Sequence, residues 1–175
     1  MNSSQNFISK YFNQISLISK LIDINGINKL VYELKSLKKR NGRLFFLGVG
    51  GSAGNASHAV NDFRKLCNIE CYCPTDNVSE LTARINDEGW ETSFAEWLKV
   101  SNVKRKDSIF IFSVGGGSKS KKVGVNLIKA IDYAKKNKMK VFGIIGKKNG
   151  NAKKKGDNVI VVQEVNDKLV TPFSE

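Results

Sequence analysis

Two stretches of this chain decide its fold class. Residues 43–54 read RLFFLGVGGSAG, and residues 108–118 read SIFIFSVGGGS. Each is a short apolar run that ends in glycine and serine, a pattern typical of a buried strand that leads into a tight turn. Further apolar runs predict three more strands, at 69–73, 140–145 and 158–162. Strands that are apolar throughout are typical of a parallel sheet covered on both faces.

The segments around these strands have helical character. Apolar residues recur at helical spacing in 5–22 and 27–37, so residues 1–42 are expected to form a helical hairpin. The rest, residues 43–175, is expected to form an α/β core, because helical segments alternate with the strands. These segments are predicted at 54–67, 78–84, 90–99 and 119–136, and Thr171-Pro172 favours a further helix start near the end.

Length and composition exclude several classes of protein. The chain has 175 residues, which suits one domain, and its 41% hydrophobic content is too high for a disordered chain. A run of about 18 apolar residues, as a membrane span requires, is absent from the sequence. The N-terminus does not resemble a secretory signal, so the three cysteines are expected to be reduced thiols in the cytoplasm.

The net charge of +13 is concentrated in one part of the chain. Residues 99–155 contain 17 Lys or Arg and only two acids, Asp107 and Asp132. This block could be a solvated surface, which the excess of 24 Lys over 5 Arg favours, or it could attract an anionic small ligand. Nucleic acid is disfavoured as a partner, because specific base contacts tend to use arginine forks.

The two glycine-rich turns are candidate anion sites. At the carboxyl ends of parallel strands, glycines let backbone N–H groups approach an anion, and the next helix adds its dipole. Lysines at 119, 121 and 122 are expected in the first turn of the second helix, where they oppose the dipole unless an anion is bound. Two alternatives remain: glycines that only make tight turns, and a dinucleotide fingerprint at Gly48-x-Gly50-x-x-Ala53 with Asp76 as the ribose acid.

Four features together resemble the sugar-isomerase (SIS) domain family, and within it the phosphoheptose isomerases. They are the Gly-Gly-Ser helix start, the pair His58 and Asp62, the segment 75–90 and the turn Ser-Val-Gly-Gly-Gly-Ser. The resemblance implies a flavodoxin-like three-layer α/β sandwich with a central parallel sheet. It also implies a homo-oligomer, a tetramer or a dimer, that interconverts sedoheptulose 7-phosphate and glycero-manno-heptose 7-phosphate.

The resemblance also implies roles for individual residues. Asp62 would be the catalytic base, since aldose–ketose isomerisation moves a proton between adjacent carbons and needs a carboxylate near them. His58 and Asp62 would be zinc ligands, and they lie four residues apart on one helical face. The implied substrate-binding residues are Gly50, Gly51, Ser52, Asn86, Asp87, Ser113, Val114, Gly115 and Ser118.

The sequence departs from the family pattern at the metal site. Asp62 is one methylene shorter than the family's glutamate, and the sequence ends at Glu175, where the family continues into a helix that supplies a glutamine and a histidine. A zinc site needs three or four protein ligands, and His58 and Asp62 supply two. We therefore expect that zinc binding is possible, but that the zinc site is incomplete in this chain. The alternative function is therefore a truncated, non-catalytic SIS module that binds sugar phosphates as a regulator or partner subunit.

Two further departures concern the phosphate turn and the cysteines. Val114 and Gly115 replace hydroxyl-bearing residues of the better-known phosphate loop. Cys67, Cys71 and Cys73 could form a Cys3His zinc site with His58, but their spacing is not that of a recognised zinc knuckle, and small buried hydrophobic residues are the simpler interpretation.

Overall fold

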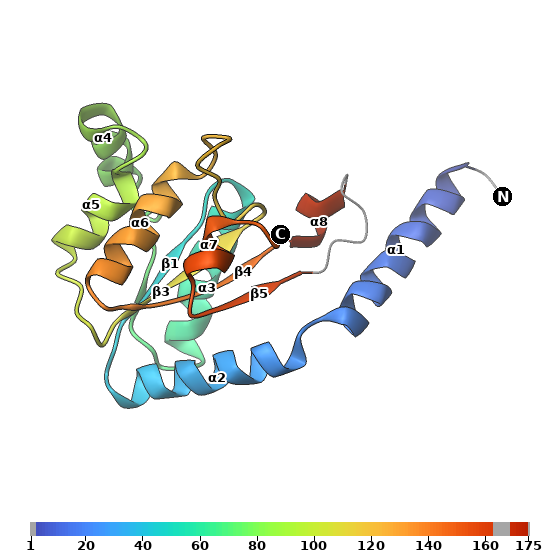
Figure 1. Ribbon diagram of the computed structural model, residues 1–175, viewed down its shortest axis with the longest axis horizontal. Helices are drawn as coiled ribbons and strands as arrows, with labels where there is room; N and C mark the ends of the chain where they lie inside the picture. Colours follow the sequence, from blue (N-terminus) through green and yellow to red (C-terminus); the bar gives the residue numbers. More distant parts are fainter. Residues whose placement is uncertain (1–2, 163–168, 175) are drawn as a thin grey trace.

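The computed structural model describes residues 3–162 and 169–174 (Figure 1). Five parallel strands form one sheet in the order β2-β1-β3-β4-β5. The strands are β1 Leu44–Leu47, β2 Cys71–Tyr72, β3 Ser108–Ser113, β4 Lys140–Ile145 and β5 Asn158–Val161. The predicted parallel sheet is confirmed, and two of the predicted strands, 108–113 and 140–145, have the expected bounds.

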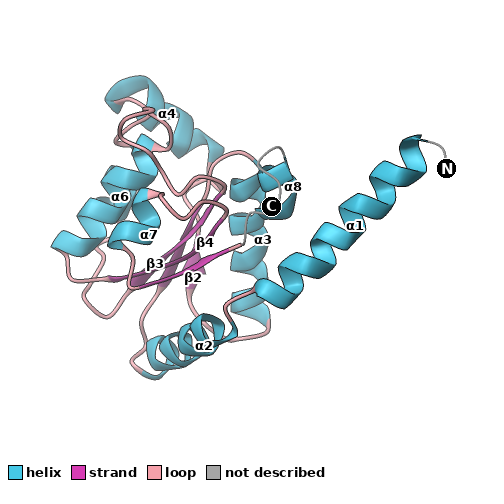
Figure 2. Ribbon diagram, turned by 45° about the vertical axis from the view of Figure 1, so that its right-hand side comes forward, coloured by secondary structure: helices cyan, strands magenta, loops and turns pink. Residues whose placement is uncertain are grey.

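Helices cover both faces of the sheet, which makes the architecture a three-layer sandwich (Figure 2). Successive strand residues point to opposite faces. Phe45 and Leu47 pack in one apolar cluster with α5 Ser93–Val100, α6 Val125–Lys136 and α7 Asn151–Lys155. Leu44 and Phe46 belong to a second cluster, which contains residues of α2 Ile24–Lys39 and α3 Gly51–Lys65. The fold is therefore the predicted flavodoxin-like α/β sandwich.

A buried ion pair secures the start of β3. Asp107 is fully buried, and its Oδ2 lies 2.8 Å from Nη2 of Arg43, the residue before β1. The same carboxylate accepts hydrogen bonds from the backbone N–H groups of Arg43 (2.9 Å) and Lys104 (2.8 Å). The hydrogen bond with Asp107 raises the pKa of Arg43 above its ordinary value. The entries into β1 and β3 are thus held together by one carboxylate.

The two N-terminal helices form, but they do not lie side by side. α1 Ser3–Leu21 leads away from the body, whereas α2 packs beneath the sheet, in contact with β5 (Figures 1 and 2). Asp23 caps α2 by accepting a hydrogen bond from Gly26 N, so the new helix starts within three residues of the end of α1. Much of the apolar stripe of α1 is exposed: Phe7, Ile8, Phe12, Ile15, Leu17 and Leu21.

Other helix bounds differ from the sequence prediction. The predicted helix 119–136 begins only at Val125, because Ser118 and Val123 form an antiparallel bridge and Gly124 has φ +61°. The lysines at 119, 121 and 122 therefore lie in this turn and not in the first turn of a helix. The prediction that their charges oppose a helix dipole is wrong. The short helix α7 was not predicted. The remaining helices are α4 Val78–Glu88 and α8 Val170–Ser174.

Within the described ranges, no helix is both long enough and apolar enough to cross a membrane.

Candidate functional site

The carboxyl ends of β1 and β3 mark the place where a parallel sheet of this order binds ligands. The chain passes from β1 outward to β2, then returns to the other side of β1 to form β3. At such a switch point the loops after the two strands turn to opposite faces and leave a crevice between them. Both glycine-rich turns predicted from the sequence lie at this crevice.

The first turn joins β1 to α3 through a close backbone approach. A Cβ on Gly48 would lie 2.0 Å from the carbonyl oxygen of Ser52, so only glycine fits there. Gly50 precedes α3 with φ +66°, and Gly50 and Gly51 are exposed. The Ser52 side chain is buried, with 2% of the residue exposed. The N-terminus of a 15-residue helix is thus presented at the edge of the sheet, where its dipole favours an anion.

The second turn follows β3 and is shaped by glycines. Gly116 and Gly117 have φ values of +67° and +80°, and a Cβ on Gly117 would lie 2.9 Å from Cγ1 of Ile128. The backbone N–H of Gly116 donates to Oγ of Ser113 over 3.0 Å. Ser118 Oγ lies 3.2 Å from Ser120 Oγ. The turn therefore has one defined conformation that few sequences could adopt.

A third segment, which sequence analysis missed, completes this turn. The loop after β4 packs so closely that a Cβ on Gly150 would lie 2.4 Å from the carbonyl oxygen of Gly115. The backbone N–H groups of Asn151 and Ala152, at the start of α7, donate to the carbonyl oxygens of Gly117 (2.9 Å) and Gly116 (2.8 Å). The sequence indicates a turn here, since residues 146–150 read GKKNG after an apolar strand, but it does not indicate that this turn packs against the turn after β3.

The turns after β3 and β4 enclose a cavity of about 440 Å³, which we call the carboxyl-edge cavity. Val114, Gly115 and Ser118, three of the predicted substrate residues, line it. Three cations also line it, Lys121, Lys147 and Lys154, and none of them forms an ion pair with another described residue. The hydroxyl-bearing residues Ser118 and Ser120 and three unpaired cations around one cavity suit a phosphate group.

The remaining predicted residues form two local pairs outside that cavity. Nε2 of His58 lies 3.3 Å from Oδ2 of Asp62 on α3, with the two side chains 77% and 44% exposed. On α4, Nδ2 of Asn86 donates to Oδ1 of Asp87 over 2.7 Å, and both residues are exposed. Within the described residues, no hydrogen bond or ion pair connects the pairs with each other or with the turn after β3.

The donor set on α3 does not fit a complete zinc site. His58 and Asp62 supply two ligands, and in the part of the chain that the structure describes no group of three His, Cys, Asp or Glu side chains is placed to hold a metal. Protein zinc sites use at least three such ligands. A metal at His58 and Asp62 would therefore need donors beyond this set, and we derive no catalytic step through it.

The cysteines do not form the alternative zinc site either. Cys67 is exposed, whereas Cys71 and Cys73 are buried. Burial raises the pKa of the Cys71 thiol to about 12 and also raises that of Cys73, whose Sγ lies 2.9 Å from Oγ1 of Thr75. A zinc ligand must be a thiolate, so these buried thiols are poor candidates and behave as small apolar residues.

Comparison with known proteins agrees with the fold. The solved structure of phosphoheptose isomerase from Neisseria gonorrhoeae superposes with a TM-score of 0.81 over 96% of this chain and 91% of that chain, at 19% sequence identity, so it shares the SIS fold. A search against protein-family models finds no match.

Curated relatives identify the family within this class. Phosphoheptose isomerase from Leptospira biflexa is 34% identical over 155 residues, which are 83% of this chain and 73% of the relative. Phosphoheptose isomerase from Helicobacter pylori is 28% identical over 142 residues, 78% of this chain and 70% of the relative. The chain belongs to the phosphoheptose isomerase family of SIS-domain proteins.

Proposed function

We propose that the protein is an aldose–ketose isomerase that acts on a heptose 7-phosphate, interconverting sedoheptulose 7-phosphate and glycero-manno-heptose 7-phosphate. The observation that carries this proposal is the carboxyl-edge cavity, which places a glycine-built turn and three unpaired lysines on the ligand-binding edge of the sheet. Membership of the phosphoheptose isomerase family supports the substrate class.

In this proposal the phosphate anchors the sugar at the turn after β3. Val114, Gly115 and Ser118 line the cavity and contact the phosphate, Ser113 holds the turn by accepting from Gly116 N–H, and Lys121, Lys147 and Lys154 balance the charge. A fixed remote phosphate holds the reacting carbons in one place, which removes much of the entropic cost of catalysis. Gly50, Gly51 and Ser52, at the N-terminus of α3, lie on the other side of the crevice and bind the sugar.

Asp62 is the proposed base that moves the proton between C1 and C2. His58 lies next to it, with Nε2 3.3 Å from Oδ2 of Asp62, and it is proposed to orient this carboxylate. Asn86 and Asp87 are proposed to contact the sugar hydroxyls from α4. Since 44% of the Asp62 side chain is exposed in the single chain, productive catalysis needs this face to be covered.

A second copy of the chain is the proposed cover. α1 leads away from the sheet, and several of its apolar side chains are exposed, although Ile18 is buried and Tyr11 stacks on Phe173 of α8 (Figure 1). Exposed apolar faces of this extent mark interaction surfaces. We propose a homo-oligomer through α1, and analytical ultracentrifugation should show that replacing Phe7 and Phe12 by Glu shifts the protein towards the monomer.

The second candidate function is binding of the sugar phosphate without turnover. The two-ligand set of His58 and Asp62 favours it, because the described residues provide no third metal donor. A module of this kind would retain the carboxyl-edge cavity and serve as a regulator or as a partner of a catalytic subunit.

An isomerase assay on sedoheptulose 7-phosphate, followed by NMR after EDTA treatment and again after addition of zinc, tests the two candidates. The proposal predicts turnover, and Asp62→Asn should lower kcat by about 100-fold or more, since a positioned general base contributes about 10²–10⁴-fold. Glu91→Gln is the matched control, because Glu91 is an exposed acid whose carboxylate lies 3.2 Å from the Lys129 ammonium, outside the proposed site. Binding with no turnover in either condition would establish the second candidate, and absence of binding would exclude both.

A further inference from the structure

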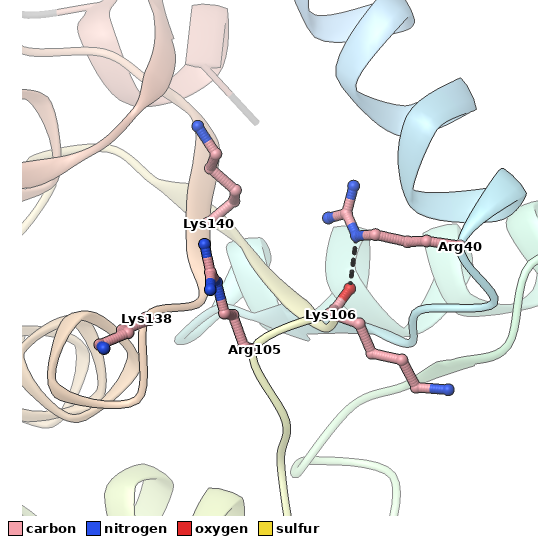
Figure 3. Close-up of a pocket in the computed structure, with 5 residues that line it drawn as sticks. All are labelled: Arg40, Arg105, Lys106, Lys138 and Lys140. Carbon is pink, nitrogen blue, oxygen red and sulfur yellow. Dashed lines mark hydrogen bonds between the residues drawn. The ribbon is translucent and has the colours of Figure 1, made fainter.

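A second basic cavity lies at the opposite edge of the sheet. Its volume is about 660 Å³, and all five residues that line it are cations: Arg40, Arg105, Lys106, Lys138 and Lys140 (Figure 3). We call it the amino-edge cavity. It is separated from the carboxyl-edge cavity by the six residues of β3, or about 17 Å at roughly 3.3 Å per residue, so the two cannot share one phosphate.

Three loops that are distant in sequence bring these cations together. Arg40 ends α2 before β1, Arg105 and Lys106 precede β3, and Lys138 and Lys140 lie between α6 and the first residue of β4. Because β1, β3 and β4 are neighbours and parallel, all three loops enter the sheet at the same edge. The cluster is therefore a consequence of the topology and would not be visible as a sequence motif.

Hydrogen bonds to uncharged groups orient the Arg40 guanidinium, and no described acid pairs with it. Its Nε donates to the carbonyl oxygen of Lys106 over 2.8 Å (Figure 3). Its Nη1 and Nη2 donate to the hydroxyls of Ser36 and Ser108, each over 3.3 Å. All three acceptors are uncharged, so the guanidinium keeps its full charge, and it retains N–H donors for a ligand. A fixed arginine fork of this kind suits the oxygens of a phosphate.

Three acids lie near the cavity, and two of them pair with one of its cations, Lys140. The Asp107 carboxylate is buried and bound by Arg43. Glu33 and Asp157 each lie 3.9 Å from the Lys140 ammonium, and Asp157 is closer to Lys135, at 2.9 Å.

Arg40, Arg105 and Lys138 form no ion pair with any residue in the described part of the chain. Several cations around one cavity repel each other unless an anion offsets their charge.

Helix dipoles explain only part of the cluster. Arg40 and Lys138 follow the C-termini of α2 and α6, where a cation is favourable. Arg105 lies on a loop and Lys140 begins a strand, so neither gains from a helix end. Lys138 also has φ +58°, a left-handed conformation that glycine or asparagine adopts more readily. The concentration of charge therefore goes beyond what the helix ends require.

We propose that the amino-edge cavity binds a compact polyphosphate, an anion with two or three linked phosphate groups such as tripolyphosphate or the phosphate chain of a nucleotide. Four of the five cations have no ion pair among the described residues, which exceeds the charge of a single phosphate, and 660 Å³ is within the usual range for a small-molecule site. The cations surround one cavity instead of following an extended groove, which favours a compact ligand over nucleic acid. This proposal is independent of the proposed isomerase activity.

Isothermal titration calorimetry with sodium tripolyphosphate, inorganic phosphate and ATP tests the proposal on the full chain. At the amino-edge cavity, tripolyphosphate should bind at least about tenfold more tightly than phosphate, because each additional charge-assisted hydrogen bond adds affinity. Equal affinities for ATP and tripolyphosphate would show that the phosphates alone are recognised, whereas tighter binding of ATP would identify a nucleotide. Both results support the proposal.

Variants locate the binding. Arg105→Gln, an exposed position, should weaken tripolyphosphate binding by about tenfold, whereas Lys20→Gln, the same charge change on α1, should leave it unchanged. Lys147→Gln should also leave it unchanged, because Lys147 lines the other cavity. Equal losses from Arg105→Gln and Lys20→Gln would overturn the proposal. It would also be overturned if a 12-nucleotide single strand bound more tightly than tripolyphosphate and lost affinity in Arg105→Gln.

Discussion

The two basic cavities lie at opposite ends of the same strand, but they are constructed differently. The carboxyl-edge cavity is shaped by backbone, through Gly116, Gly117 and Gly150, and its cations are added at the rim. The amino-edge cavity is lined by five cationic residues from three loops, and the buried ion pair between Arg43 and Asp107 joins two of the strand entries next to it. A backbone-built cavity leaves a glycine pattern in the sequence, whereas a side-chain-built cavity leaves only scattered lysines and arginines.

The largest expected effect on stability comes from breaking the buried ion pair between Arg43 and Asp107 at the amino edge. Asp107→Ala would leave the Arg43 guanidinium and two backbone N–H groups without their acceptor. Breaking a buried ion pair from one side costs about 3–5 kcal/mol, so we expect the free energy of unfolding to fall by about that amount in urea denaturation. Glu91→Ala, which breaks the exposed pair with Lys129, should change it by less than about 1 kcal/mol. Similar losses in both variants would contradict this account of the amino edge.

A smaller effect on stability is expected at the carboxyl edge, where the backbone of the turn after β3 shapes the cavity. Gly117→Ala forces φ +80° on alanine and brings a Cβ to 2.9 Å from Ile128, so the free energy of unfolding should fall by about 2–3 kcal/mol. Binding of sedoheptulose 7-phosphate should weaken in the same variant, because the turn changes shape. Gly54→Ala is the matched control: it lies in α3 with nothing within 4 Å of its new Cβ, and it should stabilise the protein by about 0.5–1 kcal/mol. If thermal unfolding shows no difference between the two variants, the turn is not conformationally fixed.

The difference between the cavities also explains how much the sequence could predict. Alternating apolar runs and glycine turns predicted the parallel sheet, the two turns at the β1 and β3 ends and the two N-terminal helices. These features depend on local patterns of a few residues. The prediction of a helix over residues 119–124 was wrong. The helical periodicity begins at Val125, and the preceding residues form a turn that is closed by the bridge between Ser118 and Val123.

Features that depend on tertiary contacts were beyond the sequence. The contribution of Lys147 and Lys154 to the carboxyl-edge cavity follows from the packing of Gly150 against Gly115, which no periodicity indicates. The direction of α1 was missed as well, since its apolar stripe was compatible with packing on α2. The roles of His58, Asp62, Asn86 and Asp87 came from family resemblance, and they stay predictions until activity is measured.

The central claim is that the carboxyl-edge cavity binds the phosphate of the sugar, and calorimetric titration with sedoheptulose 7-phosphate tests it most directly. Lys147→Gln should weaken binding by about tenfold through loss of one charge-assisted contact, whereas Lys138→Gln at the amino edge should change it by less than about twofold. Sedoheptulose without its phosphate should bind far more weakly than the phosphate ester. Equal affinity for the two sugars, or a larger loss in Lys138→Gln than in Lys147→Gln, would contradict the account.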